Sequence, residues 1–122
     1  MKILHCVPSL SPTMGGPTEV VIHLVQALRN IGVDSEIVST NDDVDRTLPV
    51  PLGVRTEYRG VPCWFFPRSI LRHRQFIFSA PLSAWLWKNV SRYDMVDIHY
   101  LFTYSSTFAA WACRAHGVPY TI

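Results

Sequence analysis

The first segment whose residue types could bind a ligand is Gly15-Gly16-Pro17, between a predicted strand and a predicted helix. Glycine lets the backbone approach a ligand closely, and a helix N-terminus presents free N–H groups to an anion. This segment is therefore a candidate loop for a diphosphate or an acceptor. A tight turn that needs a positive φ angle explains the glycines equally well. The spacing matches neither G-x-G-x-x-G nor G-x-x-x-x-G-K-[ST], which disfavours a dinucleotide fold or a P-loop.

The second such segment is Asp97-Ile98-His99-Tyr100, at the carboxyl end of a predicted strand. In open α/β sheets, ligands bind outside the carboxyl ends of the strands. Asp97 and His99 are two residues apart, so their side chains point to the same face. The pair is a candidate polar group that orients a substrate hydroxyl or phosphate. The alternative is a histidine hydrogen-bonded to a neighbouring loop.

The remaining polar residues favour structural roles. We interpret His5 as a hydrogen-bonded histidine beside the sheet, and His23 and His116 as helix-surface residues. Glu19 falls in the first turn of the predicted helix, where the helix dipole favours an anion. No Ser-His-Asp order, metal-ligand cluster or close acidic pair indicates a hydrolase. Three cysteines without C-x-x-C spacing predict reduced thiols, with neither a disulfide nor a zinc site.

The stretch Arg68–Trp87 combines basic and aromatic residues. Such a pattern could form a membrane-surface or lipid-acceptor face. A solvated loop beside a core helix would show the same composition.

The composition limits the class of protein. The chain has 122 residues, 48% of them hydrophobic and 16% charged, with a net charge of +2. This excludes a disordered chain and predicts one domain. The charge is too small to indicate nucleic-acid binding. No apolar run is long enough for a membrane span, and the N-terminus does not resemble a signal peptide, so we expect a cytoplasmic location.

The hydrophobic pattern alternates short strands with amphipathic helices. Strand 2–7, which Pro8 ends, is followed by a helix from Pro17 to Ile31 and a strand at 33–40, and these form a right-handed βαβ unit. The helix should bury Val20, Val21, Leu24, Val25, Leu28 and Ile31, and Gly32 should end it. The later elements are predicted as a short strand near 54–58, an edge strand at 61–67, a helix from 79–80 to 90, a strand at 93–99, a helix at 105–115 and a strand at 118–122. We expect a Rossmann-like α/β fold with a mostly parallel sheet and flanking helices.

Several of these segments resemble a known family of enzymes, the family 4 retaining glycosyltransferases of GT-B fold. The resemblance rests on Met1–Pro8, Met14–Glu19, Leu24–Leu28 with Gly32, Tyr93–Phe102 and Arg114–Tyr120. It covers nearly the whole chain, and the stretch 41–78 is the least diagnostic part.

The resemblance implies an enzyme with two Rossmann-like domains that face each other across a cleft. Gly15, Gly16, Pro17 and Thr18 would lie near the donor diphosphate and the acceptor. His99 would lie near the transferred sugar as the catalytic candidate, with Asp97 and Tyr100 on the acceptor side. The family often has a second histidine where this sequence has Asp97. The nucleotide-sugar donor is a substrate, so no cofactor and no metal are expected.

We expect residues 1–122 to be a truncated N-terminal domain, because the sequence ends within a predicted strand and holds no E-x7-E pattern. Its partners would be a nucleotide sugar, an unidentified acceptor and the missing C-terminal domain. The fragment alone should be inactive. Contact with the inner face of a membrane and homo-oligomers are open possibilities, and no nucleic acid is expected. The alternative function is a non-catalytic Rossmann-like module that binds a partner or a second copy of itself.

Overall fold

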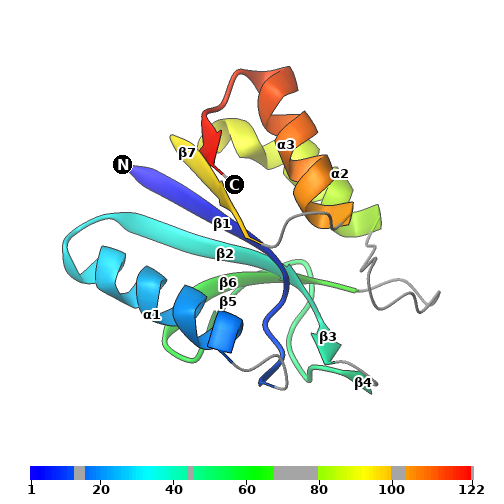
Figure 1. Cartoon of the computed structure of the whole chain (residues 1–122). Coiled ribbons are helices and arrows are strands. Elements are labelled where there is room, and N and C mark those ends of the chain that lie inside the picture. Colours follow the sequence, from blue (N-terminus) through cyan, green and yellow to red (C-terminus); the bar gives the residue numbers. More distant parts are fainter. Residues whose placement is uncertain (13–15, 44–45, 68–79, 100–103, 122) are drawn as a thin grey trace.

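The fold is a sheet with helices on both faces (Figure 1). The computed structural model describes residues 1–12, 16–43, 46–67, 80–99 and 104–121. Within them, six strands form a sheet of order β5-β6-β2-β1-β7-β8, in which only β5 is antiparallel to its neighbour. The elements are β1 (Lys2–Ser9), α1 (Gly16–Asn30), β2 (Asp34–Thr40), β3 (Asp42–Asp43), β4 (Arg46–Thr47), β5 (Arg55–Tyr58), β6 (Val61–Phe66), α2 (Ala80–Asn89), the 3-10 turn η2 (Val90–Arg92), β7 (Met95–Ile98), α3 (Tyr104–His116) and β8 (Tyr120–Thr121). The predicted α/β class with a mostly parallel sheet is confirmed.

The first βαβ unit forms as predicted, with β1 and β2 parallel and α1 between them. Gly32 ends the helix region with a φ angle of 90°, a conformation that favours glycine. One boundary was wrong, because β1 continues through Pro8 to Ser9. The pairing with β2 shifts register between Cys6 and Ser9, and the Thr40 hydroxyl donates to the Pro8 carbonyl at 2.6 Å. Such an irregularity lets a strand include a proline.

The buried side of α1 differs from the predicted stripe. Val21, Ile22 and Val25 are buried against the sheet, whereas Val20 is 63% exposed and Ile31 76% exposed. Ile31 lies one residue beyond the helix. The run of apolar residues in this helix is wider than one face, so spacing alone did not decide which residues meet the sheet.

The edge position predicted for 61–67 is also wrong, because β6 lies between β2 and β5. Arg59 and Gly60 both have positive φ angles and join β5 to β6 in a two-residue turn. The residues beside such a turn form a hydrogen-bonded pair, so the next pair, Glu57 and Pro62, does not use the N–H that proline lacks. Proline is therefore tolerated beside β5, and on the other side of β6 the pairing with β2 begins only at Cys63.

The later elements follow the predicted order with altered ends. α2 buries Leu82 and Leu86 as expected, and α3 ends before Gly117, whose φ angle is 69°. β7 and β8 are shorter than predicted, and the β3–β4 hairpin was not predicted. Residues 68–79, which make up most of the basic and aromatic stretch, lie outside the described residues.

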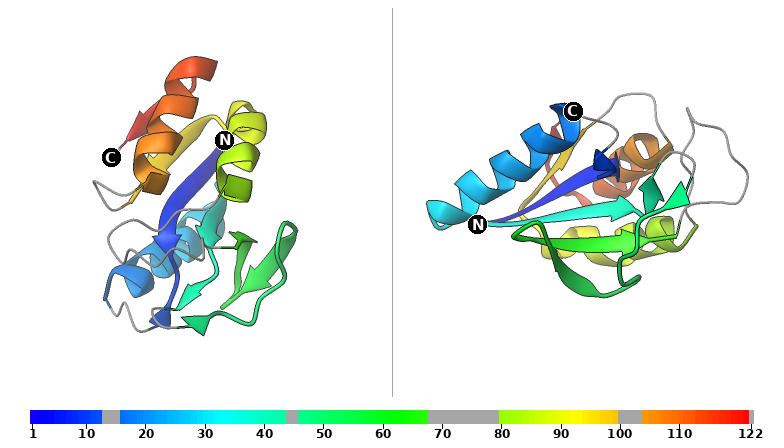
Figure 2. Two further views of the ribbon diagram at one scale, coloured as in Figure 1. Left: turned by 90° about the vertical axis from the view of Figure 1, so that its right-hand side faces the viewer. Right: turned by 90° about the horizontal axis from the view of Figure 1, so that it is seen from below.

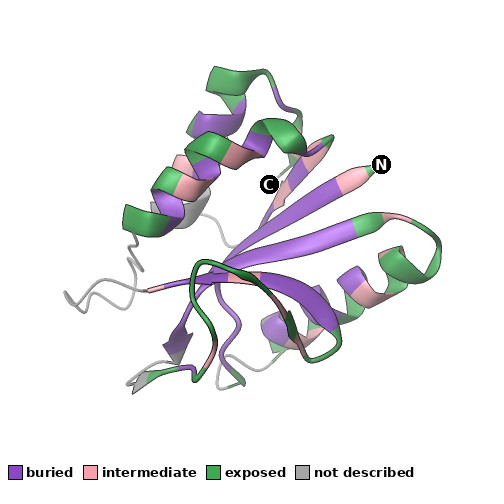
Figure 3. Ribbon diagram, turned by 180° about the vertical axis from the view of Figure 1, so that it is seen from behind, coloured by how far each residue is buried: buried purple, intermediate pink, exposed green. Residues whose placement is uncertain are grey.

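Each face of the sheet has its own hydrophobic core. Leu4 and Cys6 of β1 pack with residues of α2 and α3, whereas Val7 of β1 packs with residues of α1. Figure 2 shows α2 and α3 together on one side of the sheet and α1 on the other. The middle strands are buried along most of their length (Figure 3). The alternation of side chains along β1 thus supplies both cores.

A buried carboxylate connects β2 with three other parts of the fold. Glu36 is 3% exposed and accepts hydrogen bonds from Tyr93 Oη at 2.6 Å, Arg55 Nε at 3.0 Å and Trp64 Nε1 at 3.2 Å. Burial by itself would raise the pKa of Glu36, but these hydrogen bonds together outweigh it and hold the pKa below its usual range. Glu36 is therefore ionised in the folded protein at neutral pH.

We predict that Glu36→Gln lowers the free energy of unfolding at pH 7 by roughly 2 kcal/mol, because an amide accepts these bonds less strongly than a carboxylate. A folded-state pKa below the unfolded one stabilises the fold above the unfolded pKa, and that stabilisation is lost as the pH falls through the folded pKa. Wild-type stability should therefore decrease below about pH 4.5 more steeply than that of the variant. Urea unfolding at several pH values measures both effects.

Glu57→Gln, at an exposed position on β5 of the same sheet, is the matched control and should change the unfolding free energy little. Equal pH profiles for wild type and Glu36→Gln would show that Glu36 does not contribute this way.

Candidate functional site

A row of polar side chains crosses three parallel strands at one register. His5 of β1 pairs with Asp97 of β7, and Asp97 pairs with Thr121 of β8. Residues at one register of parallel strands point to the same face, here the side of α1. The Thr121 hydroxyl donates to Asp97 Oδ1 at 2.8 Å. This bond orients the carboxylate so that its second oxygen is available to the histidines.

His99 joins this row at the carboxyl end of β7. Its backbone N–H donates to the Cys6 carbonyl at 3.0 Å, which fixes the residue beside β1. His99 Nε2 lies 3.2 Å from Asp97 Oδ2, and His5 Nδ1 lies 3.3 Å from the same oxygen. The two ring nitrogens are 3.4 Å apart. Three atoms that can bind a proton or a cation thus converge on one point.

The members of this cluster differ in exposure. The side chain of His5 is 2% exposed, whereas those of Asp97 and His99 are 23% and 21% exposed. Burial lowers the pKa of His5 to about 4, and the attraction of Asp97 offsets this only in part. His5 is therefore neutral at pH 7, with a ring nitrogen that can accept. Asp97 and His99 give the cluster an opening to solvent.

Gly16 does not show the feature that the sequence offered as an alternative explanation of the two glycines. That alternative was a tight turn with a positive φ angle. Gly16 has no positive φ angle, and among the described residues nothing lies within 4 Å of a Cβ atom at this position. In the described part of the chain, the first turn of α1 is therefore open at Gly16, and neither the φ angle nor close packing explains the glycine.

The other residues of the predicted loop are placed in part. Thr18 is buried, and its hydroxyl donates to the Ser11 carbonyl at 3.0 Å, so the group it could offer a ligand is its backbone N–H in the first turn of α1. Pro17 lies in that turn as expected. Gly15 and Tyr100 lie outside the described residues.

The sheet topology brings the two predicted segments to one edge. β1 and β7 are adjacent and parallel, α1 begins after the carboxyl end of β1, and His99 follows the carboxyl end of β7. Gly16 and His99 are therefore on the same edge of the sheet, although they are 83 positions apart in the sequence. This is the edge at which α/β sheets bind ligands.

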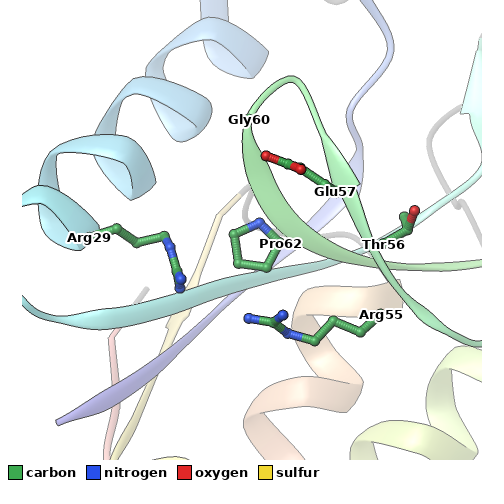
Figure 4. Close-up of a pocket in the computed structure, with 6 residues that line it drawn as sticks. All are labelled: Arg29, Arg55, Thr56, Glu57, Gly60 and Pro62. Atoms are coloured by element: carbon green, nitrogen blue, oxygen red, sulfur yellow. The ribbon is translucent and has the colours of Figure 1, made fainter.

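A small pocket lies elsewhere, beside the last turn of α1 and the β5–β6 hairpin (Figure 4). Its volume is about 190 Å³, and its lining is Arg29, Arg55, Thr56, Glu57, Gly60 and Pro62. Arg29 already binds Asp34 at 3.0 Å, and Arg55 binds Glu36 at 3.0 Å. Because both arginines have partners, and the pocket lies near the amino ends of β2 and β6, we do not assign it to the candidate site.

Sequence reasoning missed the part played by His5. The residue was interpreted as structural, and no metal-ligand cluster was predicted, yet the structure groups His5, Asp97 and His99. The signal that could have found it is the alternation of side chains along a strand. Asp97 and His99 share one face of β7, so a histidine in the middle of β1 lies beside them if β1 and β7 pair in parallel with the matching register. That register could not be read from the sequence.

The comparison with known protein families decides the class of the domain. The profile of the glycosyl transferase 4-like domain matches residues 15–122. This chain belongs to that family. The match covers both segments of the candidate site and agrees with the resemblance inferred from the sequence. No curated protein and no solved structure matches the chain.

Membership in the glycosyl transferase 4-like family implies a nucleotide-sugar donor and transferase activity in the protein that carries the domain. In the described part of the chain, no helix has the length and hydropathy needed to cross a membrane.

We predict that Gly16→Val leaves the free energy of unfolding within about 0.5 kcal/mol of wild type, because the new side chain enters open space. Gly32→Val is the matched comparison and should cost about 1–3 kcal/mol, because its φ angle of 90° strains any other residue. Chemical denaturation measures both. A large loss of stability in Gly16→Val would mean that this glycine serves the fold rather than a ligand.

Proposed function

We propose that this chain is the acceptor-side domain of a retaining glycosyltransferase that moves a sugar from a nucleotide-sugar donor to a hydroxyl acceptor. The observation that carries the proposal is the placement of Gly16 and His99 at one edge of the sheet, after adjacent parallel strands. The family match to residues 15–122 supports the transferase class.

The first turn of α1 is suited to an anion. Its backbone N–H groups have no partners within the helix, and the helix dipole favours negative charge there. Gly16 leaves the approach to this turn open. Donors of this kind stabilise the charge that develops on a diphosphate leaving group as the glycosidic bond breaks.

His99 is suited to holding a sugar or an acceptor hydroxyl. Its ring is partly exposed, and its backbone is fixed by the bond to Cys6, so it offers a positioned polar group at the edge of the site. Asp97 beside it restricts the ring orientation at 3.2 Å. Correct placement of the two reacting groups accounts for a large part of the rate in such transfers.

In this proposal, a second, donor-binding domain makes the main contacts to the nucleotide. The described residues provide one wall of a site: a helix N-terminus and a polar cluster. We therefore propose that the 122 residues alone do not catalyse transfer. Peripheral contact with a membrane stays a prediction, because residues 68–79 lie outside the described part.

We predict that the 122-residue chain binds nucleotide sugars with millimolar affinity, because so few contacts do not offset the ordering cost of association. Amide spectra recorded during titration with UDP-glucose, GDP-mannose and inorganic pyrophosphate should shift first at Gly16, Thr18 and His99. Gly16→Val should abolish the shifts of the first turn of α1 while the fold is kept. Glu57→Gln, at the opposite edge, should leave them unchanged.

Two outcomes would contradict this assignment. Micromolar binding or turnover by these 122 residues would overturn the division between two domains. Shifts confined to the pocket at Arg29 and Arg55 would remove Gly16 and His99 from the site.

The alternative function is self-association without catalysis, and one surface observation favours it. Trp87 of α2 is 40% exposed and Trp111 of α3 is 58% exposed. Their ring centroids are 5.2 Å apart, so the two rings form one exposed apolar patch. Large exposed aromatic rings are typical of interaction surfaces.

If a second copy covers this patch, Trp111→Ser should shift the protein toward the monomer in sedimentation at concentrations where wild type forms dimers. Val20→Ser, at an exposed apolar position on α1, is the control and should not. A wild-type monomer over a wide range of concentrations would contradict self-association.

A further inference from the structure

We propose that His5, Asp97 and His99 form a binding site for a divalent transition-metal ion, with zinc as the best match. The ligand atoms would be His5 Nδ1, Asp97 Oδ2 and His99 Nε2. Sequence analysis expected no metal. The inference does not depend on the proposed transferase function, because it rests on the geometry of three side chains.

The spacing of the three atoms matches one face of a tetrahedron. They lie 3.2, 3.3 and 3.4 Å apart. Zinc binds histidine nitrogen and carboxylate oxygen at about 2.0–2.1 Å, so two ligands of a regular tetrahedral site are about 3.3–3.4 Å apart. Octahedral ligands at the same bond length, as around Mg²⁺, would be about 2.8–3.0 Å apart. The observed triangle therefore favours a tetrahedral ion.

Hydrogen bonds alone explain the triangle less well. Asp97 Oδ2 can accept a hydrogen bond from each histidine, which accounts for two of the three sides of the triangle. Both ring nitrogens would then carry protons directed at the same oxygen, although they are only 3.4 Å apart. A cation removes this conflict, because each of the three atoms then presents a lone pair to a common centre.

The surroundings of the three atoms also suit a metal. Thr121 holds the other oxygen of Asp97, the kind of outer contact that orients a ligating carboxylate. The partial exposure of Asp97 and His99 gives an ion a path to the site and leaves a fourth position for water or a substrate oxygen.

One feature limits the expected affinity. With Nδ1 on the metal, the proton of His5 is on Nε2, a buried nitrogen that has no hydrogen-bond partner among the described residues. Ligating histidines usually donate this proton to an outer partner, and loss of such a partner costs about 10–100-fold in affinity. We therefore expect micromolar rather than nanomolar binding.

The cysteines do not compete for the ion. Cys6, Cys63 and Cys113 are free and buried in the two hydrophobic cores, and none of them belongs to the cluster of His5, Asp97 and His99. Binding by the folded chain should therefore show no thiolate contribution.

The test is calorimetric titration of the metal-free 122-residue chain with Zn²⁺ and, separately, with Mg²⁺. We expect one Zn²⁺ per chain with micromolar affinity and no binding of Mg²⁺. His99→Gln and Asp97→Asn should each weaken zinc binding at least about tenfold. Both side chains are partly exposed, so these variants should fold, which circular dichroism checks.

His23→Gln is the matched control, because His23 and Glu19 form an exposed pair 3.9 Å apart that could bind zinc adventitiously. This variant should bind as wild type does. Co²⁺ in place of Zn²⁺ should give the strong visible absorption of a tetrahedral site without a thiolate charge-transfer band, and His99→Gln should lose it. Absence of zinc binding, unchanged affinity in His99→Gln, or loss of binding in His23→Gln would each overturn the proposal.

Discussion

The parallel pairing of β1 with both β2 and β7 is the constraint on which the rest of the structure depends. It buries β1 on both faces and divides its side chains between the two hydrophobic cores. It also aligns the carboxyl ends of the strands, so that α1 begins and His99 follows at the same edge. The register of His5 with Asp97 results from this same pairing. A slip by one residue would move His5 to the opposite face and separate the cluster.

Glu36 is a second constraint, on the opposite face of the sheet from His5. Its carboxylate joins β2 to β5, to β6 and to Tyr93 before β7. These contacts connect the hairpin at one side of the sheet with the segment that leads into β7. The charge is tolerated because three donors offset its burial. The candidate site and the Glu36 network thus lie on the two faces of one sheet and support different properties, ligand contact and stability.

The candidate site combines features with different physical origins. The first turn of α1 offers backbone donors and open space, whereas the cluster of His5, Asp97 and His99 offers converging side-chain atoms. We propose the first of these as a site for a sugar diphosphate. A cation at the second would place a positive charge on the same edge of the sheet. Phosphate oxygens and a cation are chemically compatible neighbours, so the two proposals do not exclude each other.

The sequence by itself determined the order of strands and helices, the parallel βαβ unit and the glycine that ends α1. These follow from local causes: apolar periodicity, and residues such as Gly32 that permit one conformation. The D-x-H segment and the glycine loop could also be predicted as candidates, since one lies at the carboxyl end of a predicted strand and the other joins a predicted strand to a helix. The family resemblance was readable from the same segments.

Tertiary structure alone decided three further features. The register of β1 against β7 placed His5 beside Asp97, because pairing depends on how both faces pack and not on either strand alone. The hairpin at Arg59 and Gly60 covered β6 and made Pro62 an interior residue. Among the described residues, nothing lies within 4 Å of a Cβ atom at Gly16, and only the arrangement of the elements in space decides this.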